Sequence, residues 1–154
     1  MWERFRRYRA LPPIARELFR RAAVLLPILT MSLRLRGLQA TQAMLKRRVT
    51  SGIPEAAPAE MRERTGWTVR MVNAASRYTV GHATCLERSL AIWWLLARQG
   101  VASDLRIGVR KSGDHFEAHA WVEQQTAPLH MAETDHEHYA AFDASFSSLP
   151  TERT

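Results

Sequence analysis

The sequence predicts an α+β fold, with helices in the first part of the chain and a small antiparallel sheet in the second. Residues 14–99 carry apolar side chains at helical spacing, whereas residues 104–133 alternate between apolar and polar side chains in short runs. Residues 85–99 are apolar almost all round, which predicts a helix buried at the centre of the fold. With 154 residues, of which 46% are hydrophobic, the chain can build one domain with a modest core.

The first predicted helix covers about residues 14–36. A proline pair precedes it, and proline suits a helix start because no backbone N–H is needed there. Pro27 lies inside the helix and would kink or split it. Gly37 predicts a break. A second helix then covers residues 38–48, and the cations at its C-terminal end suit the helix dipole.

A loop of proline and small residues covers residues 51–58 and separates this first part of the chain from the rest. A further helix is predicted over residues 59–78. We therefore predict a basic helical N-terminal region over residues 1–50 and a core region over residues 51–154, together forming one compact domain.

Charge is unevenly spread along the chain. Residues 1–50 contain 12 Lys and Arg against 2 Asp and Glu, a net charge of +10. The remaining residues contain 10 Lys and Arg against 13 Asp and Glu, a net charge of −3. A region as basic as the first suits nucleic acid, anionic lipid, or an acidic peptide or protein. Since apolar side chains accompany the charge, we predict a mixed interface with a peptide or protein and no nucleic-acid binding.

An apolar stretch, residues 22–31, follows the basic start of the chain. It contains Pro27, lacks a clear cleavage site, and is shorter than the about 20 apolar residues of a membrane-spanning helix. A buried helix is therefore predicted, with contact of residues 14–36 with a membrane surface as the alternative. The single cysteine excludes an intramolecular disulfide and fits a reducing compartment, so a cytoplasmic protein is expected, with membrane association as the alternative.

Cys85, the one cysteine of the chain, comes at the start of the apolar helix. Thr84 followed three residues later by Glu87 predicts a capping box, with Thr84 as the N-cap and Cys85 as the first helical residue. Unpaired N–H groups and the positive end of the helix dipole stabilise an anion there, and a thiolate is such an anion. Gly100 would end the helix in the left-handed conformation. This predicts a reactive nucleophile, and a buried structural cysteine is the alternative.

Two alternating segments predict a β-hairpin whose strands cover residues 104–110 and 116–123, joined by a turn at residues 111–114. One face of the second strand carries Phe116, Ala118, Ala120 and Val122, and the hairpin as a whole would pack on the central helix. The other face carries Glu117, His119, Trp121 and Glu123. A turn at residues 125–128 would lead to a third short strand over residues 129–133.

His119 is the predicted base for Cys85. A cysteine at a helix start and a histidine on a neighbouring strand form the core of a Cys-His nucleophilic site. Such a site needs neither a metal nor an organic cofactor, and we predict neither. It does need a third group that orients the imidazole.

A carboxylate beyond the second hairpin is predicted to be that third group. If the hairpin turns at Thr126, Glu133 falls opposite His119, because the two positions are symmetric about the turn. Asp135 is the second candidate. Asp143 lies farther along the chain and is the weakest of the three.

Four blocks of sequence resemble the lasso-peptide biosynthesis B2 proteins. They occur in order with the expected gaps: Cys85-Leu86-Glu87-Arg88-Ser89-Leu90-Ala91, residues 95–101, residues 105–110, and Ala118-His119-Ala120-Trp121-Val122-Glu123. The resemblance covers about residues 66–143. B2 proteins are transglutaminase-like cysteine proteases, so the resemblance implies a transglutaminase-like, papain-like core in which a central helix packs on a small antiparallel sheet.

The resemblance also implies a leader peptidase. Such an enzyme removes the leader peptide from a lasso peptide precursor and frees the N-terminal amine of the core for macrolactam formation by an ATP-dependent synthetase. A small, separate leader-recognition protein would hold the leader. By resemblance Cys85 is the nucleophile and His119 the general base. An Asp often stands where this chain has Met131, so the third member falls to Glu133 or Asp135.

Three other functions compete with the peptidase. A transglutaminase-like acyltransferase would use the same Cys-His pair and differ only in its acceptor. A metal site would have to draw on four residues whose spacing matches no strong motif, so a solvated polar loop is expected there instead: His130, Asp135, His136 and His138. A non-enzymatic basic adaptor would explain the charge of residues 1–50 but not the capping box, the cysteine or the histidine.

Overall fold

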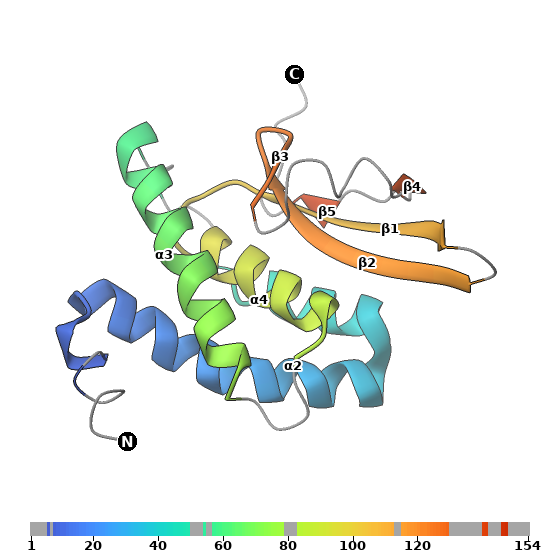
Figure 1. The fold of residues 1–154 in the computed structure, drawn as a ribbon, viewed down its shortest axis with the longest axis horizontal. Helices are drawn as coiled ribbons and strands as arrows, with labels where there is room; N and C mark the ends of the chain where they lie inside the picture. Colours follow the sequence, from blue (N-terminus) through green and yellow to red (C-terminus); the bar gives the residue numbers. More distant parts are fainter. Residues whose placement is uncertain are drawn as a thin grey trace.

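The computed structural model describes residues 6, 8–49, 54, 57–78, 83–112, 115–129, 140, 141, 146 and 147. The helices and strands follow in this order: α2 (Pro13–Lys46), α3 (Pro58–Ser76), α4 (Cys85–Ala97), β1 (Asp104–Ser112), β2 (His115–Gln124), β3 (Ala127–Pro128), β4 (Ala140–Ala141) and β5 (Phe146–Ser147). The helices gather on one side of the sheet (Figure 1). Helices first and an antiparallel sheet second confirm the predicted α+β class.

Helix α2 consists of two helical arms that meet at Gly37. The glycine has φ 75° and ψ 179°, a left-handed conformation that side chains other than hydrogen rarely allow. The predicted break at this position is therefore confirmed. A split at Pro27 was wrong, because the backbone stays helical there. Leu26 and Leu29 beside the proline are fully buried, and this packing holds the helix together despite the missing backbone N–H.

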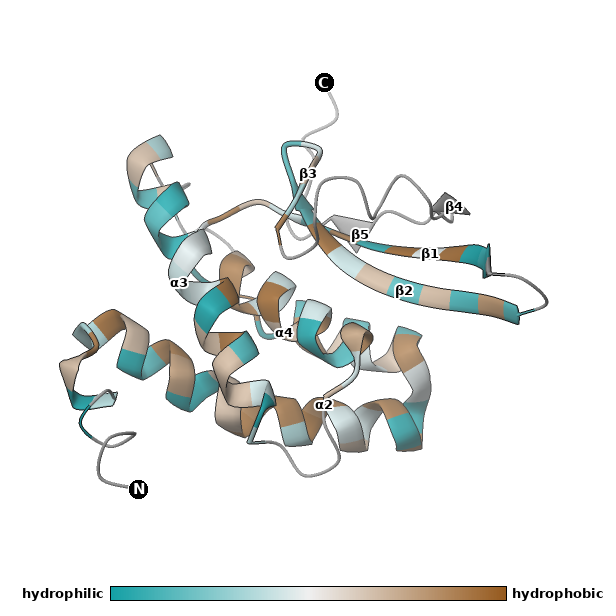
Figure 2. Cartoon of the chain, in the orientation of Figure 1, coloured by the Kyte–Doolittle hydropathy of each residue, from teal (hydrophilic) through white to brown (hydrophobic). Residues whose placement is uncertain are grey.

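Helix α4 lies at the centre of the core, as its apolar sequence predicts. Polar positions of α4 gather in its first turns, and apolar positions dominate the rest (Figure 2). One cluster of buried side chains joins all three helices to the sheet, and it includes Leu26, Leu29, Val72, Leu90, Trp93, Leu96, Leu105 and Val122. The basic first part of the chain thus packs in the same core as the strands.

The sheet is antiparallel, in the order β3-β2-β1-β4, and β5 also pairs with β1. In the β1–β2 hairpin, Leu105 lies opposite Val122, and both belong to the core beside α4. The apolar face predicted for β2 packs on the helices only in its second half. Phe116 is 76% exposed, because the first half of the strand extends past the start of α4 (Figure 1). Of this face, Ala120 and Val122 are therefore the residues that contribute to the core.

The second hairpin is tighter than predicted. Gln124 pairs with Ala127 and Glu123 with Pro128, so the turn is centred between Gln125 and Thr126 rather than on Thr126. Both turn residues have positive φ, 50° and 68°, which matches the twist of a two-residue hairpin loop. The predicted centre on Thr126 was therefore wrong, and the pairing of Glu133 with His119 that rested on it lies outside the described residues. Residues 130–133 of the predicted third strand lie outside the described part of the chain.

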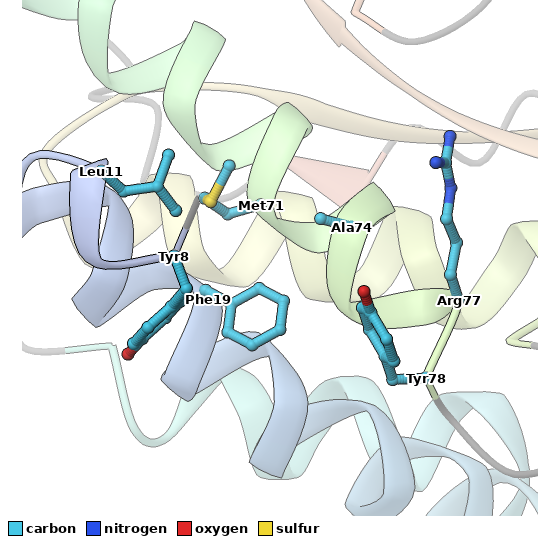
Figure 3. Close-up of a pocket in the computed structure, with 7 residues that line it drawn as sticks. All are labelled: Tyr8, Leu11, Phe19, Met71, Ala74, Arg77 and Tyr78. Atoms are coloured by element: carbon cyan, nitrogen blue, oxygen red, sulfur yellow. The ribbon is translucent and has the colours of Figure 1, made fainter. Parts of the chain in front are cut away.

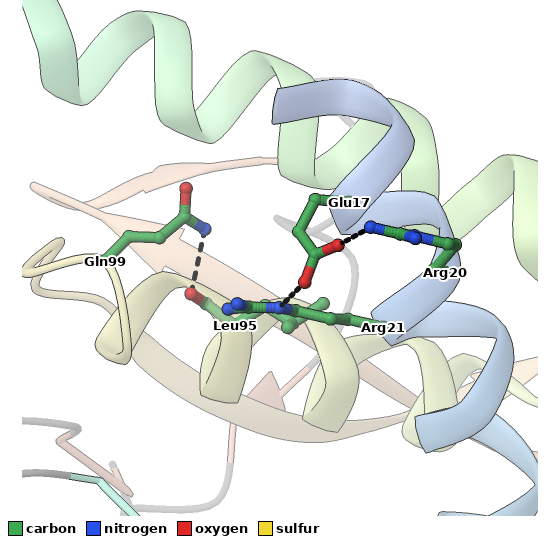
Figure 4. Close-up of polar contacts among 5 residues, drawn as sticks. All are labelled: Glu17, Arg20, Arg21, Leu95 and Gln99. Carbon is green, nitrogen blue, oxygen red and sulfur yellow. Dashed lines mark hydrogen bonds and ion pairs between the residues drawn. The ribbon is translucent and has the colours of Figure 1, made fainter. Parts of the chain in front are cut away.

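Polar contacts fix the outer surface of the helices. Glu17 of α2 forms ion pairs with Arg20 and Arg21, the latter at 2.7 Å (Figure 4). The hydrogen bonds from Arg21 and then Arg20 lower the pKa of the Glu17 carboxyl. Gln99, just beyond α4, donates to the backbone oxygen of Leu95 at 2.8 Å. Among the described helices, none combines the length and apolarity needed to cross a membrane.

Candidate active site

Cys85 is the first residue of α4, and the predicted capping box is present. The Glu87 backbone N–H donates to Thr84 Oγ1 at 3.3 Å, and the Thr84 N–H donates to Glu87 Oε2 at 2.6 Å. Glu87 is buried, so its side chain is held in place by packing as well as by the hydrogen bond. Cys85 itself is half-buried. Its thiol therefore lies beside the unpaired N–H groups of a well-ordered helix start, where an anion is favoured.

A buried hydrogen bond holds the start of α4 against β2. Ser89 Oγ donates to the backbone oxygen of Ala120 at 2.9 Å, and both residues are almost completely buried. Ser89 lies about one helical turn, roughly 6 Å, after Cys85. Ala120 directly follows His119 in the sequence. The bond therefore brings the N-terminal end of α4 to the part of β2 that contains the histidine.

His119 lies in a ladder of side chains on one face of the sheet. Its ring stacks with that of Trp121, with centroids 6.4 Å apart and 15° between the planes. The Trp121 Nε1–H donates to Glu123 Oε1 at 2.8 Å, and Glu123 Oε2 accepts from Arg106 Nε at 3.0 Å. Trp121 is almost completely buried, and the Nε2 atom of His119 is shielded from solvent. The imidazole is thus positioned by a buried aromatic ring that an ion pair fixes.

Sequence reasoning missed the positioning role of Trp121, Glu123 and Arg106. The alternation of side chains along β2 indicates this role in part, because residues 119, 121 and 123 share one face of the strand. The antiparallel register adds Arg106, which lies directly opposite Trp121 on β1. The cross-strand partner could be found only after the hairpin register was known.

The carboxylates predicted as third member lie outside the described residues, and so do the histidines of the alternative metal site. This applies to Glu133, Asp135, Asp143, His130, His136 and His138. Within the described part of the chain, no group of three His, Cys, Asp or Glu side chains could hold a metal ion.

A hollow of about 460 Å³ lies between the start of α2 and the end of α3 (Figure 3). Three aromatic rings border it in edge-to-face contact, with centroids 5.7 Å apart for Tyr8 and Phe19 and 6.2 Å apart for Phe19 and Tyr78. Arg77 is the one cation in its described lining. Neither Cys85 nor His119 belongs to this lining, so the hollow is distinct from the Cys-His region.

A family model with the description transglutaminase-like superfamily matches residues 16–143, most of the chain. The protein belongs to the transglutaminase-like superfamily. Its members are typically cysteine-based enzymes and include cysteine proteases and acyltransferases. The match begins inside α2, so the first helix is part of the superfamily domain. No curated protein and no solved structure matches the chain.

Proposed function

We propose that this protein is a cysteine endopeptidase that removes the leader from a lasso peptide precursor. The observation that carries the proposal is the placement of Cys85 at a capped helix start, which the Ser89–Ala120 bond holds against β2, the strand that contains His119. Membership of the transglutaminase-like superfamily supports a cysteine-based reaction. The four sequence blocks that resemble B2 proteins lie in α4, β1, β2 and the segment between α4 and β1.

The reaction begins with attack of the Cys85 thiolate on the carbonyl carbon of the scissile peptide bond. The backbone N–H of Cys85 donates to the oxygen on which negative charge develops. The C–N bond then breaks, and protonated His119 gives its proton to the leaving amine, which becomes the new N-terminus of the core peptide. A thioester between Cys85 and the leader remains.

Water completes the cycle. His119 takes a proton from the water molecule as it attacks the thioester carbon, and the C–S bond breaks to release the leader as a carboxylate. The thiolate is restored. A carboxylate that accepts the second ring N–H of His119 would keep the correct tautomer, and Glu133, with Asp135 second, is our proposal for this role.

The proposed partners rest on the resemblance to B2 proteins. The substrate is a precursor peptide, presented by a small leader-recognition protein. The freed amine is the nucleophile that an ATP-dependent macrolactam synthetase needs to close the ring. No metal or organic cofactor takes part, because thiol and imidazole supply both the nucleophile and the proton transfers.

The experiment that tests the proposal combines the purified protein, a precursor peptide and a leader-recognition protein, with mass spectrometry of the products. A peptidase yields a free leader and a free core whose masses together equal that of the precursor plus one water molecule. An acyltransferase instead yields a cross-link to an added primary amine. Such a cross-link, or an intact precursor in the presence of the partner protein, would contradict the peptidase proposal.

A further inference from the structure

A groove of about 410 Å³ lies between the two arms of α2 and the outer side of α4. It exists because the left-handed Gly37 lets the second arm fold back beside the first. Val24 and Ile28 from the first arm, Met44 from the second, and Trp94 from α4 form its apolar walls.

An exposed apolar stripe continues this wall along the first arm of α2. Four residues share one helix face, at intervals of four, three and four positions: Val24, Ile28, Met31 and Leu35. Their exposed fractions are 64%, 44%, 59% and 75%. The stripe is about 16 Å long at the rise of an α-helix. Exposed apolar side chains in a continuous row mark an interaction surface rather than ordinary surface scatter.

Arginines surround the groove. Arg21, Arg48 and Arg98 belong to its lining, and an adjoining hollow of about 380 Å³ shares Arg48 and adds Arg36 and Arg47. No Asp or Glu occurs among the described residues that line either hollow. We use the name arginine groove for the whole surface, which consists of the 410 Å³ groove, the exposed apolar stripe and these five arginines.

The floor of the arginine groove is fixed before any partner binds. The Trp94 Nε1–H donates to the backbone oxygen of Leu45 at 3.0 Å, which ties α4 to the second arm of α2. The Arg98 guanidinium lies 5.0 Å from the centre of the Trp94 ring, and its Nη1 donates to the Arg48 oxygen at 3.5 Å. A surface that is already ordered loses little conformational entropy on binding.

We propose that the arginine groove binds an amphipathic helix of a partner protein that carries Asp and Glu on both sides of an apolar stripe. The apolar side chains of that helix would lie along Val24 and Ile28, with one or two of them in the groove. Its carboxylates would pair with Arg48 and Arg98. Nucleic acid fits poorly because the apolar walls provide no hydrogen-bond donors for its phosphates. A bilayer fits poorly because its flat surface cannot enter a concave groove.

The test uses the full-length protein and a synthetic helix-forming peptide of about 18 residues, long enough to be partly helical in water. Leu residues at helical spacing form its apolar stripe, and Glu residues flank the stripe. Binding is measured by fluorescence anisotropy. We expect Arg48→Glu and Ile28→Glu each to weaken binding by about tenfold or more, and a scrambled peptide of the same composition to bind at least as poorly.

Arg62→Glu is the matched control, because Arg62 is exposed on α3. The substitution changes the net charge by the same amount as Arg48→Glu. It should leave peptide affinity within about twofold, since a remote exposed charge acts only through screened solvent. Circular dichroism confirms that each variant is folded. Equal losses in Arg48→Glu and Arg62→Glu would reduce the attraction to net charge and overturn the proposal.

Two further probes address the other partners. Vesicles of phosphatidylglycerol and phosphatidylcholine represent a membrane, and a DNA duplex represents nucleic acid. Tighter binding of either probe than of the peptide, lost in Arg48→Glu and kept in Arg62→Glu, would assign the arginine groove to that partner and overturn the proposal. None of these measurements depends on Cys85, so their outcome is separate from that of the peptidase assay.

Discussion

The two ends of α4 have opposite surroundings. At its N-terminal end, Glu87 is buried in the capping box and Ser89 is bonded to β2 in the core. At its C-terminal end, Arg98 is exposed and lies over the Trp94 ring beside an open groove. Glu87 thus lies where the helix dipole favours negative charge, and Arg98, the C-cap, lies where it favours positive charge. The N-terminal end suits chemistry, which needs fixed geometry, and the C-terminal end suits docking, which needs accessible charge and apolar surface.

Removing the predicted reactive groups, Cys85 and His119, should have the largest effect. We expect Cys85→Ala and His119→Ala each to abolish leader removal, because loss of either group stops the chemical step. The measurement is precursor cleavage by purified variants, followed by mass spectrometry. His115→Ala is the matched control, since His115 is exposed on the same strand and should retain activity. Turnover like that of the wild type in Cys85→Ala or His119→Ala would disprove the site.

The third member of the site should have the next largest effect. Glu133→Gln is expected to slow cleavage by at least about 100-fold, as for carboxylates that orient a catalytic histidine. Alkylation of Cys85 should continue, because the thiol itself is unchanged. If Asp135→Asn is the crippled variant instead, Asp135 holds the role. If neither variant is slow, His119 is oriented by another group, such as Asp143.

Loss of the hydrogen bond between α4 and β2 should have a smaller effect on cleavage. Ser89→Ala leaves the buried Ala120 oxygen without its donor, so unfolding free energy should fall by about 1–3 kcal/mol. Cleavage should also slow, by about tenfold or more, because the nucleophile and the strand are no longer held together. Chemical denaturation and the cleavage assay measure the two effects. Ser76→Ala is the control, because that hydroxyl donates to the Asn73 oxygen within its own helix.

The cap at the start of α4 should contribute less to stability than the Ser89–Ala120 hydrogen bond. Thr84→Ala removes the oxygen that accepts the Glu87 N–H, at an expected loss of about 1 kcal/mol. Fraying of the first turn should also slow the reaction of Cys85 with iodoacetamide at neutral pH. Thr30→Ala removes a hydroxyl bond in the middle of α2 and should leave that rate unchanged. An unchanged rate in Thr84→Ala would mean that the cap does not tune the thiol.

The smallest expected effect concerns Glu17, on the exposed surface of α2. Its pKa is lowered below the ordinary value of 4.5 by the hydrogen bonds from Arg21 and Arg20. A carboxyl with a lower pKa in the folded state stabilises that state above the unfolded pKa, and this contribution is lost as pH falls through the folded pKa. An NMR titration should place the Glu17 midpoint below 4.5, and Arg21→Gln should move it upward. A midpoint unaffected by Arg21→Gln would remove the hydrogen bond as the cause.

Local signals in the sequence were sufficient for the site's helix. Thr84 and Glu87 form the capping box because its partners are three residues apart, and the left-handed Gly37 and Gly100 follow from the missing side chain. Superfamily membership confirms the coarse resemblance to transglutaminase-like proteins. The finer assignment to lasso peptide maturation, and the roles of Cys85 and His119, stay predictions.

An unusual turn sequence and long-range packing explain what the sequence did not predict. Gln125 and Thr126 form a tight turn without the Asn or Gly that usually announces one, so the centre of the hairpin was misplaced. Phe116 looks like a core residue from its strand pattern alone, yet the strand extends beyond the helices. The arginine groove forms where α2 contacts Trp94 of α4, and no local sequence pattern predicts that contact.

The reversal of α2 at Gly37 has a consequence for the order of folding. Ser32 and Thr41, on either side of it, share a buried hydroxyl contact of 2.8 Å across only nine residues of chain. By contrast, β5 must return to pair with β1, as Phe146 does with Leu105. Short-range contacts close faster than long-range ones, and synthesis begins at the N-terminus. The arms of α2 can therefore associate before Cys85 is translated, and the helix that begins at Cys85 then folds onto an apolar surface that has already formed.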